Sequence, residues 1–133
     1  MLSEEEKEHY NRHLILDEIG IIGQEKLKDS KVLVVGAGGT GCPVLQYLSA
    51  AGVGIIGIID FDIISKSNLQ RQVLFRYNSI GKSKVIEAKQ SLKKLNPHIK
   101  YITYNEKLDT FNAEKIIKDY DIIVDCSDNF SVR

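Results

Sequence analysis

The stretch Lys31-Val-Leu-Val-Val-Gly-Ala-Gly-Gly-Thr-Gly41 decides the fold of this chain. Its valine- and leucine-rich start predicts a strand that is buried on both faces. Gly36, Gly38 and Gly41 then match the pattern G-x-G-x-x-G between that strand and a predicted helix. Glycine suits this turn because the backbone bends sharply and approaches a phosphate so closely that a Cβ would obstruct it. The helix points its N–H groups and positive dipole end at the same place, so the stretch predicts a nucleotide site.

A second apolar run, Gly54-Ile-Ile-Gly-Ile-Ile-Asp60, predicts the strand that follows this helix. Asp60 lies 19 residues beyond Gly41, where dinucleotide-binding folds place a carboxylate that holds a ribose. A cap on the connection after the strand is the alternative role for Asp60. The glycine pattern alone is a weak signal, so neither role says which nucleotide binds.

The rest of the chain predicts a further alternation of helices and strands. Helices are expected from near Glu4 and at about 23–28, 82–96 and 111–118, and strands at 99–104 and 121–125. We expect the strand at 121–125 to be buried. This order implies a parallel sheet with right-handed crossovers, that is, a Rossmann-like α/β fold with helices on both faces of the sheet.

The chain divides into two parts. Residues 1–30 are expected to form a helical segment, and residues 31–133 the N-terminal half of a Rossmann-like domain. The fourth strand of a doubly wound sheet normally opens its second half, yet the sequence stops eight residues after Asp125. We therefore expect a sheet that is truncated after its fourth strand, and a small, complete four-stranded domain is the alternative.

The composition is that of an ordinary globular protein, with 43% hydrophobic and 27% charged residues. Eighteen basic side chains balance eighteen acidic ones, which leaves no field to recruit nucleic acid or an anionic membrane. The N-terminus is acidic, unlike a signal peptide, and no apolar run approaches the ~20 residues that span a bilayer. We expect a cytoplasmic protein without nucleic-acid or membrane partners, in which Cys42 and Cys126 are reduced, packed thiols.

Basic residues near the predicted site help to distinguish between nucleotides. We expect Lys82 and Lys84 in the first turn of a helix, where each cation opposes the dipole by about 0.3–1 kcal/mol unless a polyanion binds nearby. With Arg71 they favour a triphosphate, because a helix N-terminus already holds the pyrophosphate of a dinucleotide. Asp128 follows the strand at 121–125 and would suit a Mg²⁺ between phosphate oxygens, or else would cap the next helix.

Several motifs along the chain match one known family. The matching runs are Tyr10–Leu16, Gly36–Gly41, Asp60–Asp62, Ser-Asn-Leu-Gln-Arg-Gln at 67–72, Gly81-x-x-Lys84, Asn96-Pro97 and Asp125–Asn129. They resemble the ThiF/MoeB/HesA family, adenylating enzymes related to the ubiquitin-activating enzymes, over almost the whole chain. The resemblance implies ATP and Mg²⁺, and adenylation of the C-terminal glycine carboxylate of a ubiquitin-like sulfur-carrier protein that ends in Gly-Gly. It leaves open whether thiamine or molybdopterin synthesis is served.

The resemblance also implies roles for single residues. Gly39 would lie along the phosphates, Asp60 would hold the ribose, and Asp128 would bind Mg²⁺. Arg12 matches an arginine that reaches the ATP of the other subunit in the family's homodimers. The implied catalytic residues are Arg12, Arg71, Lys84 and Asp128. The implied nucleotide-binding residues are Gly36, Gly38, Gly39, Gly41, Asp60, Ser67, Asn68, Leu69, Gln70, Arg71, Lys84, Asp128 and Asn129.

Two other functions compete with adenylation. One is a nucleotide-binding domain of an NAD-dependent oxidoreductase, with Asp60 on the adenosine ribose, and the other is a non-catalytic docking module. The three histidines lack metal-binding spacing and no C-x-x-C pair is present, so no zinc site is expected within this chain. In the family, Zn²⁺ ligands and a catalytic cysteine would lie beyond Arg133.

Overall fold

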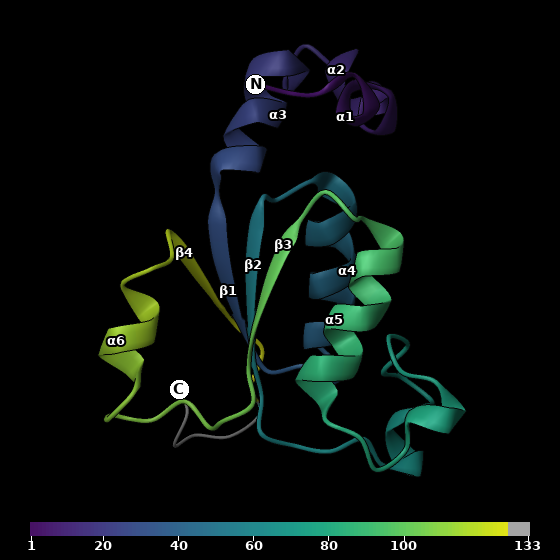
Figure 1. Ribbon diagram of the computed structural model, residues 1–133, viewed down its shortest axis with the longest axis vertical. Coiled ribbons are helices and arrows are strands. Elements are labelled where there is room, and N and C mark those ends of the chain that lie inside the picture. Colours follow the sequence, from purple (N-terminus) through teal and green to yellow (C-terminus); the bar gives the residue numbers. More distant parts are fainter. Residues whose placement is uncertain (128–133) are drawn as a thin grey trace.

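The computed structural model describes residues 1–127, and its centre is a parallel sheet with the strand order β3-β2-β1-β4 (Figure 1). The strands are β1 (Lys31–Val35), β2 (Ile55–Ile59), β3 (Lys100–Tyr104) and β4 (Ile122–Asp125). The helices are α1 (Glu4–His9), α2 (Asn11–Leu14), α3 (Gly20–Asp29), α4 (Gly41–Ala51), α5 (Lys84–Leu95) and α6 (Ala113–Ile117), with short 3₁₀ turns η1 (Lys66–Asn68) and η2 (Tyr77–Ser79). The predicted Rossmann-like arrangement is confirmed, because all neighbouring strands in the described part pair in parallel.

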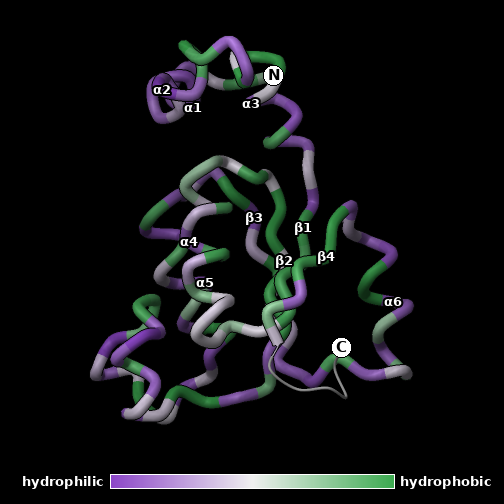
Figure 2. The backbone as a smooth tube through the Cα atoms, turned by 180° about the vertical axis from the view of Figure 1, so that it is seen from behind, coloured by the Kyte–Doolittle hydropathy of each residue, from purple (hydrophilic) through white to green (hydrophobic). Residues whose placement is uncertain are grey.

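Helices cover both faces of the sheet, with α4 and α5 on one side and α6 on the other (Figure 1). In β1, Val32 and Val34 pack with residues of α4 and α5, whereas Leu33 and Val35 pack with α6 on the opposite face. Side chains alternate along a strand, so the unbroken apolar run yields a strand buried on both faces, as predicted. Figure 2 shows the hydrophobic stretches of the strands between the helical layers.

The boundaries of α3, α5 and α6 differ from the sequence prediction by one to three residues. The helix α3 begins three residues earlier than expected. The helix α5 begins at Lys84, so the expectation that Lys82 lies in its first turn is wrong. An antiparallel bridge joins Ile63 to Ser83, and the preceding Gly81 has a positive φ of 87°, so the chain enters α5 extended.

The strand β4 is largely exposed, which corrects the prediction of a buried strand at 121–125. Ile122 and Ile123 are 56% and 37% exposed. In the described sheet β4 pairs only with β1, so it lies at the edge. An apolar run predicts the strand itself, but its burial depends on which elements lie beside it.

The N-terminal helices α1 to α3 lie beyond the end of the sheet where the strands begin (Figure 1). Buried polar groups dock them there, because Gln24 donates to the carbonyl of Ala51 (2.8 Å) and Asn96 donates to the hydroxyl of Tyr10 (2.7 Å). A Cβ on Gly52 would lie only 2.5 Å from Gln24 Nε2 and 2.8 Å from the Tyr10 ring. The junction is thus packed closely enough to fix the helices against the sheet.

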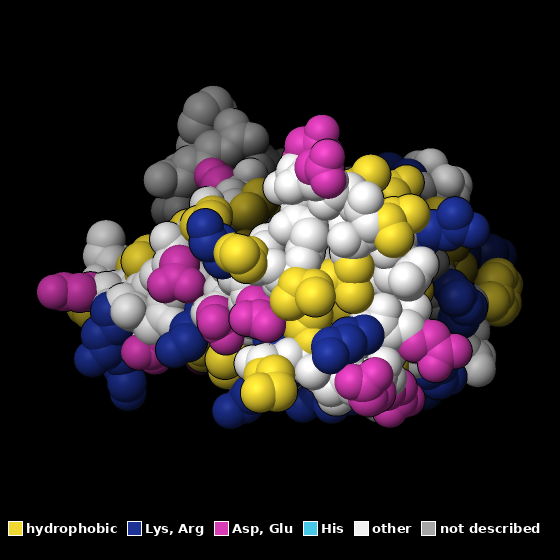
Figure 3. All heavy atoms as spheres, turned by 90° about the horizontal axis from the view of Figure 1, so that it is seen from above, with side chains coloured by type: hydrophobic (Ala, Val, Ile, Leu, Met, Phe, Trp, Pro, Cys, Tyr) yellow, Lys and Arg dark blue, Asp and Glu magenta, His cyan; other side chains and the backbone are white. Residues whose placement is uncertain are grey.

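Seen from the end that carries the N-terminal helices, the surface has hydrophobic side chains among acidic and basic ones (Figure 3). The side chains of Ile15, Leu16, Ile21 and Ile22 are 46–74% exposed. None of the described helices is both long enough and apolar enough to cross a membrane.

Candidate functional site

A cavity of about 390 Å³ lies at the end of the sheet where β1 and β2 finish. Ligands of open parallel sheets collect at this carboxyl edge. Its walls come from the glycine turn, the end of β2, the connection between β2 and α5, and the first residue of α5. Seven predicted site residues line it: Gly36, Gly38, Gly39, Asp60, Asn68, Arg71 and Lys84.

The glycine turn is built by close backbone contacts. Gly36 has a φ of 101°, and its N–H donates to the carbonyl of Ile59 (2.9 Å), which ties the turn to β2. A Cβ on Gly41 would lie 1.9 Å from the carbonyl oxygen of Gly36, so α4 could not begin there with a side chain. These contacts aim the N-terminus of α4, and with it the positive end of the helix dipole, at the cavity.

Asp60 joins the glycine turn to the chain beyond β2. Its Oδ2 accepts a hydrogen bond from the N–H of Ala37 (2.8 Å), and its Oδ1 accepts one from the N–H of Asp62 (2.8 Å). The contact with Asp62 is the capping arrangement that was the alternative for Asp60. The carboxylate also lies on the cavity, and the ribose role stays a prediction.

Arg71 lies directly over the glycine turn. Its Nε and Cδ are 3.2 Å and 3.3 Å from the point that a Cβ on Gly39 would occupy, so glycine is what leaves room for the side chain. One guanidinium nitrogen donates to the carbonyl of Ser67 (3.3 Å). Asn68 Oδ1 accepts from the N–H of Ser65 (2.9 Å), which shapes the η1 turn and leaves its amide nitrogen to serve as a donor.

Lys84 brings a buried ammonium group to the cavity. The residue is 6% exposed, and its Nζ lies 3.9 Å from Oδ2 of Asp62, whose own side chain is 57% exposed. A buried cation at a helix N-terminus is unfavourable, because it loses its hydration and opposes the helix dipole. The exposed carboxylate of Asp62, 3.9 Å away, offsets this cost only weakly. An anion bound in the cavity would supply the missing charge.

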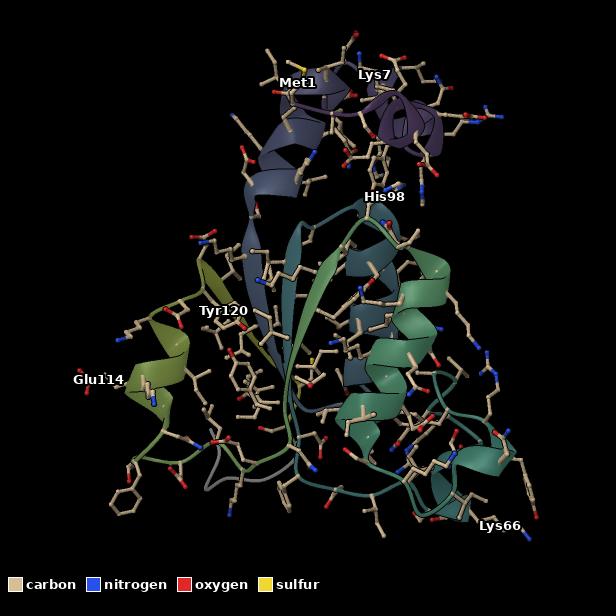
Figure 4. The ribbon with its side chains drawn as sticks, in the orientation of Figure 1. Met1, Lys7, Lys66, His98, Glu114 and Tyr120 are labelled. Atoms are coloured by element: carbon tan, nitrogen blue, oxygen red, sulfur yellow. The ribbon has the colours of Figure 1, made fainter. Side chains whose placement is uncertain are left out.

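Some predicted residues lie elsewhere. Ser67, Leu69 and Gln70 do not line the cavity, and Gly41 contributes through packing rather than as a wall. Arg12 lies on α2, at the opposite end of the sheet (Figure 1). Figure 4 gives the scale of this separation, with Lys7 and His98 near one end and Lys66 of η1 at the other. Asp128 and Asn129 lie outside the described residues.

Sequence reasoning missed several residues of the cavity wall. Val35, Ile59 and Leu108 supply an apolar side, and Gln72 and Glu106 add polar groups. Gln72 directly follows Arg71 in a run already singled out, so its neighbourhood was a usable signal. No sequence signal pointed to Leu108, because it lies in an irregular stretch between β3 and α6.

The cysteine Cys42 and the possible metal ligands of the described residues complete the account of reactive groups. Cys42 is a free, buried thiol, as predicted, and burial raises its pKa to about 11, which makes it a poor nucleophile. Residues 1–127 contain no group of three or more His, Cys, Asp or Glu side chains that could hold a metal ion.

Comparison with known proteins places these features in a family. The sequence pattern described as the ThiF family matches residues 10–133. The chain is 51% identical over 132 residues to "Adenylyltransferase and sulfurtransferase uba4" of Aspergillus niger, covering 99% of this chain and 27% of that protein. It is also 51% identical over 132 residues to "Molybdopterin-synthase adenylyltransferase" of Haemophilus influenzae, covering 99% of this chain and 54% of that protein.

A solved structure is similar as well. The crystal structure titled "E. coli MccB + ATP" superposes with a TM-score of 0.67 at 38% sequence identity, covering 70% of this chain and 28% of that one. This chain thus spans between about a quarter and about half of the relatives' lengths. Matched by the family pattern over all but its first nine residues, the chain belongs to the ThiF family.

Proposed function

We propose that the protein uses ATP to adenylate a carboxylate, and that this carboxylate belongs to the C-terminal glycine of a ubiquitin-like sulfur-carrier protein. One observation carries the proposal: Arg71, from the connection after η1, and Lys84, from the start of α5, line a single cavity together with the residues that precede α4. Three sources of positive charge around one space suit a triphosphate better than the pyrophosphate of a dinucleotide.

The names of the relatives support this reaction. Two proteins that are 51% identical to this chain are named adenylyltransferases, and one of them is a molybdopterin-synthase adenylyltransferase. MccB of E. coli, 38% identical in the matched part, has been solved with ATP. Because the chain covers only part of each, the activity and the carrier partner are inferred for the whole protein.

The cavity offers a place for each part of ATP. The apolar wall of Val35, Ile59 and Leu108 suits the adenine ring. The Asp60 oxygens keep a further lone pair each for ribose hydroxyls. The phosphates would then run along Gly39 toward Arg71 and Lys84, whose side chains border the same space.

The chemistry needs fixed positive charge more than it needs a base. A carboxylate oxygen attacks the α-phosphorus, an O–P bond forms, and the bond from the α-phosphorus to the bridging oxygen breaks, so that pyrophosphate leaves with the electron pair. The attacking carboxylate is already ionised at neutral pH and requires no proton removal. Arg71 and Lys84 would offset the repulsion between two anions and the charge that develops on pyrophosphate.

The proposal includes a Mg²⁺ ion, which Asp128 would bind. A hydrated Mg²⁺ usually binds through one or two carboxylates plus phosphate oxygens, and when bound it would neutralise part of the phosphate charge. Asp128 lies outside the described residues, and among the described ones Arg71, Lys84 and the N-terminus of α4 would compensate the phosphate charge.

A second copy of the chain would complete the site. Arg12 lies too far along the sheet to reach the cavity of its own subunit, because α2 and the cavity are at opposite ends (Figure 1). The exposed apolar residues of the N-terminal segment, Ile15, Leu16, Ile21 and Ile22, give that end a surface for subunit contact. We therefore propose that Arg12 reaches the ATP of a partner subunit.

ATP–pyrophosphate exchange in the complete protein, with a carrier that ends in Gly-Gly, tests the proposal. Lys84→Met and Arg71→Met should each slow exchange by about 10²–10³-fold, the usual effect of removing one fixed donor from a developing charge. Lys94→Met is the matched control, because Lys94 is exposed near the far end of α5. It should leave exchange unchanged.

Two outcomes would contradict the proposal. Saturable NAD binding that ATP cannot displace would favour the oxidoreductase domain. Carrier binding that survives both substitutions, without exchange in the unaltered protein, would favour a docking module.

A further inference from the structure

Gln72 is a buried polar residue on the wall of the cavity, and it takes no part in the function proposed above. The residue is 2% exposed, and its carboxamide oxygen has no hydrogen-bond partner anywhere in residues 1–127. Three buried side-chain oxygens share this condition in the described structure, but only that of Gln72 belongs to a residue lining the cavity.

The backbone holds this side chain in place. The N–H of Gln72 donates to the carbonyl of Asn68 (2.8 Å), and the N–H of Phe75 donates to the carbonyl of Gln72 (3.2 Å). The carboxamide nitrogen lies 3.5 Å from the point that a Cβ on Gly38 would occupy. Because Arg71 lies in the same way against Gly39, two consecutive side chains face two consecutive glycines of the turn.

Folding alone does not account for a glutamine here. A buried amide with an unmet acceptor weakens the folded state, whereas methionine would fill nearly the same volume without a polar atom. Residues that break a local rule of stability concentrate at functional sites. The carboxamide lies beside Gly38 of the glycine turn, where the phosphates are proposed to bind, so its position indicates a role in nucleotide binding.

We propose that Gln72 is a nucleotide-binding residue whose carboxamide nitrogen donates to a phosphate oxygen over Gly38, beside the contact of Arg71. The inference rests on the proposed ATP site and adds a ligand contact to it. A neutral amide can direct a phosphate oxygen without adding a third buried charge next to Arg71 and Lys84. A water molecule carried by the phosphates would give the carboxamide oxygen its donor.

Three variants of the complete protein test this. Gln72→Met removes both polar atoms at similar volume, and Gln72→Glu replaces the donor by a negative charge. Gln90→Met, at an exposed glutamine of α5, is the matched control. Thermal unfolding of the ligand-free proteins and calorimetric titration with ATP and with adenosine are the measurements.

The carboxamide contact predicts a specific set of results. Gln72→Met should unfold at the same or a higher temperature than the unaltered protein, yet bind ATP at least about tenfold more weakly, as expected for a lost hydrogen bond to a charged group. Gln72→Glu should lose more affinity for ATP than Gln72→Met. All three variants should keep their affinity for adenosine, which has no phosphate.

Two results would overturn the inference. If Gln72→Met binds ATP within twofold of the unaltered protein, the side chain only fills space. If the loss is equal for ATP and adenosine, Gln72 contacts the nucleoside instead of a phosphate. Failure of the proposed function itself would look different, because the unaltered protein would then not bind ATP.

Discussion

Two glycines of the same turn should respond differently to an added methyl group: Gly41→Ala should lose stability, and Gly39→Ala should lose affinity for ATP. The variants Gly39→Ala and Gly41→Ala each add one Cβ, and neither glycine has a positive φ, so alanine can adopt both backbone conformations. The difference lies in what the methyl group meets. At Gly41 it meets the backbone oxygen of Gly36 at 1.9 Å, and at Gly39 it meets the flexible side chain of Arg71 at 3.2 Å.

The geometry sets the size of each effect. Real Cβ contacts essentially never fall below 3.0 Å, so Gly41→Ala must separate α4 from Gly36 by at least 1.1 Å, which is 3.0 minus 1.9. Overpacking between rigid elements costs about 3 kcal/mol, or about 10 °C in Tm for a chain of this size. Gly39→Ala needs Arg71 to move by only a few tenths of an ångström, and the lower backbone entropy of the unfolded chain offsets part of that.

Gly39→Ala should therefore leave Tm within about 2 °C but displace Arg71 from the phosphates. Loss of part of one charged hydrogen bond weakens ATP binding by about tenfold. Calorimetry for ATP and a thermal unfolding scan measure the two quantities. The double variant Gly39→Ala/Arg71→Met decides the cause, because the alanine should have no further effect on affinity once the Arg71 side chain is shortened.

Two results would refute this reasoning. If Gly39→Ala lowers Tm as much as Gly41→Ala does, the turn itself cannot accept a methyl group. Alternatively, a further tenfold loss of ATP affinity in the Arg71→Met background would mean that the methyl group acts on the ligand directly.

Three further predictions concern stability and reactivity. Burial alone would raise the pKa of Glu6, but hydrogen bonds from Lys28 and the N–H of Ser3 bring the pKa below its ordinary value. This carboxylate therefore stabilises the fold at neutral pH, and the stabilisation is lost as pH falls through the lowered pKa. Glu6→Gln should cost about 1–3 kcal/mol in urea unfolding at pH 7, and the difference from the unaltered protein should shrink as the pH is lowered. Tyr120→Phe removes the hydroxyl that pairs with that of Tyr104 (2.8 Å) and should lower Tm by about 4 °C, with unchanged ATP affinity as the check. With a pKa of about 11, Cys42 should react with a thiol reagent at pH 8 only after urea unfolding. Because Cys126 is partly exposed, the label is located by peptide mapping, and rapid labelling of Cys42 in the folded protein would contradict its burial.

The sequence predicted the sheet well because its strongest signals are local. Val32 to Val35 form an unbroken apolar run, and the glycines after them fit only a tight turn, so strand, turn and helix follow from one stretch. Ile122 and Ile123 carry the same kind of signal, but their exposure depends on the edge position of β4, which no local pattern contains.

The site was partly predictable for a related reason. Arg71 and Lys84 were singled out by charge and by a specific motif, and both line the cavity. Lys82, with the same charge and nearly the same position, was misplaced because the bridge between Ile63 and Ser83 delays the start of α5. Gln72 belongs to the same motif, but its buried acceptor without a donor could not be predicted, because that feature exists only once the chain has folded.

The two hydrogen bonds of Asp60 have a consequence for the kinetics of nucleotide capture. Because its carboxylate already fastens Ala37 and Asp62, the glycine turn and the end of β2 are held together before a ligand arrives. An incoming nucleotide has few backbone torsions left to order, so its association rate constant should be high. Variation among ligands would then reside in how long each one stays rather than in how fast it enters.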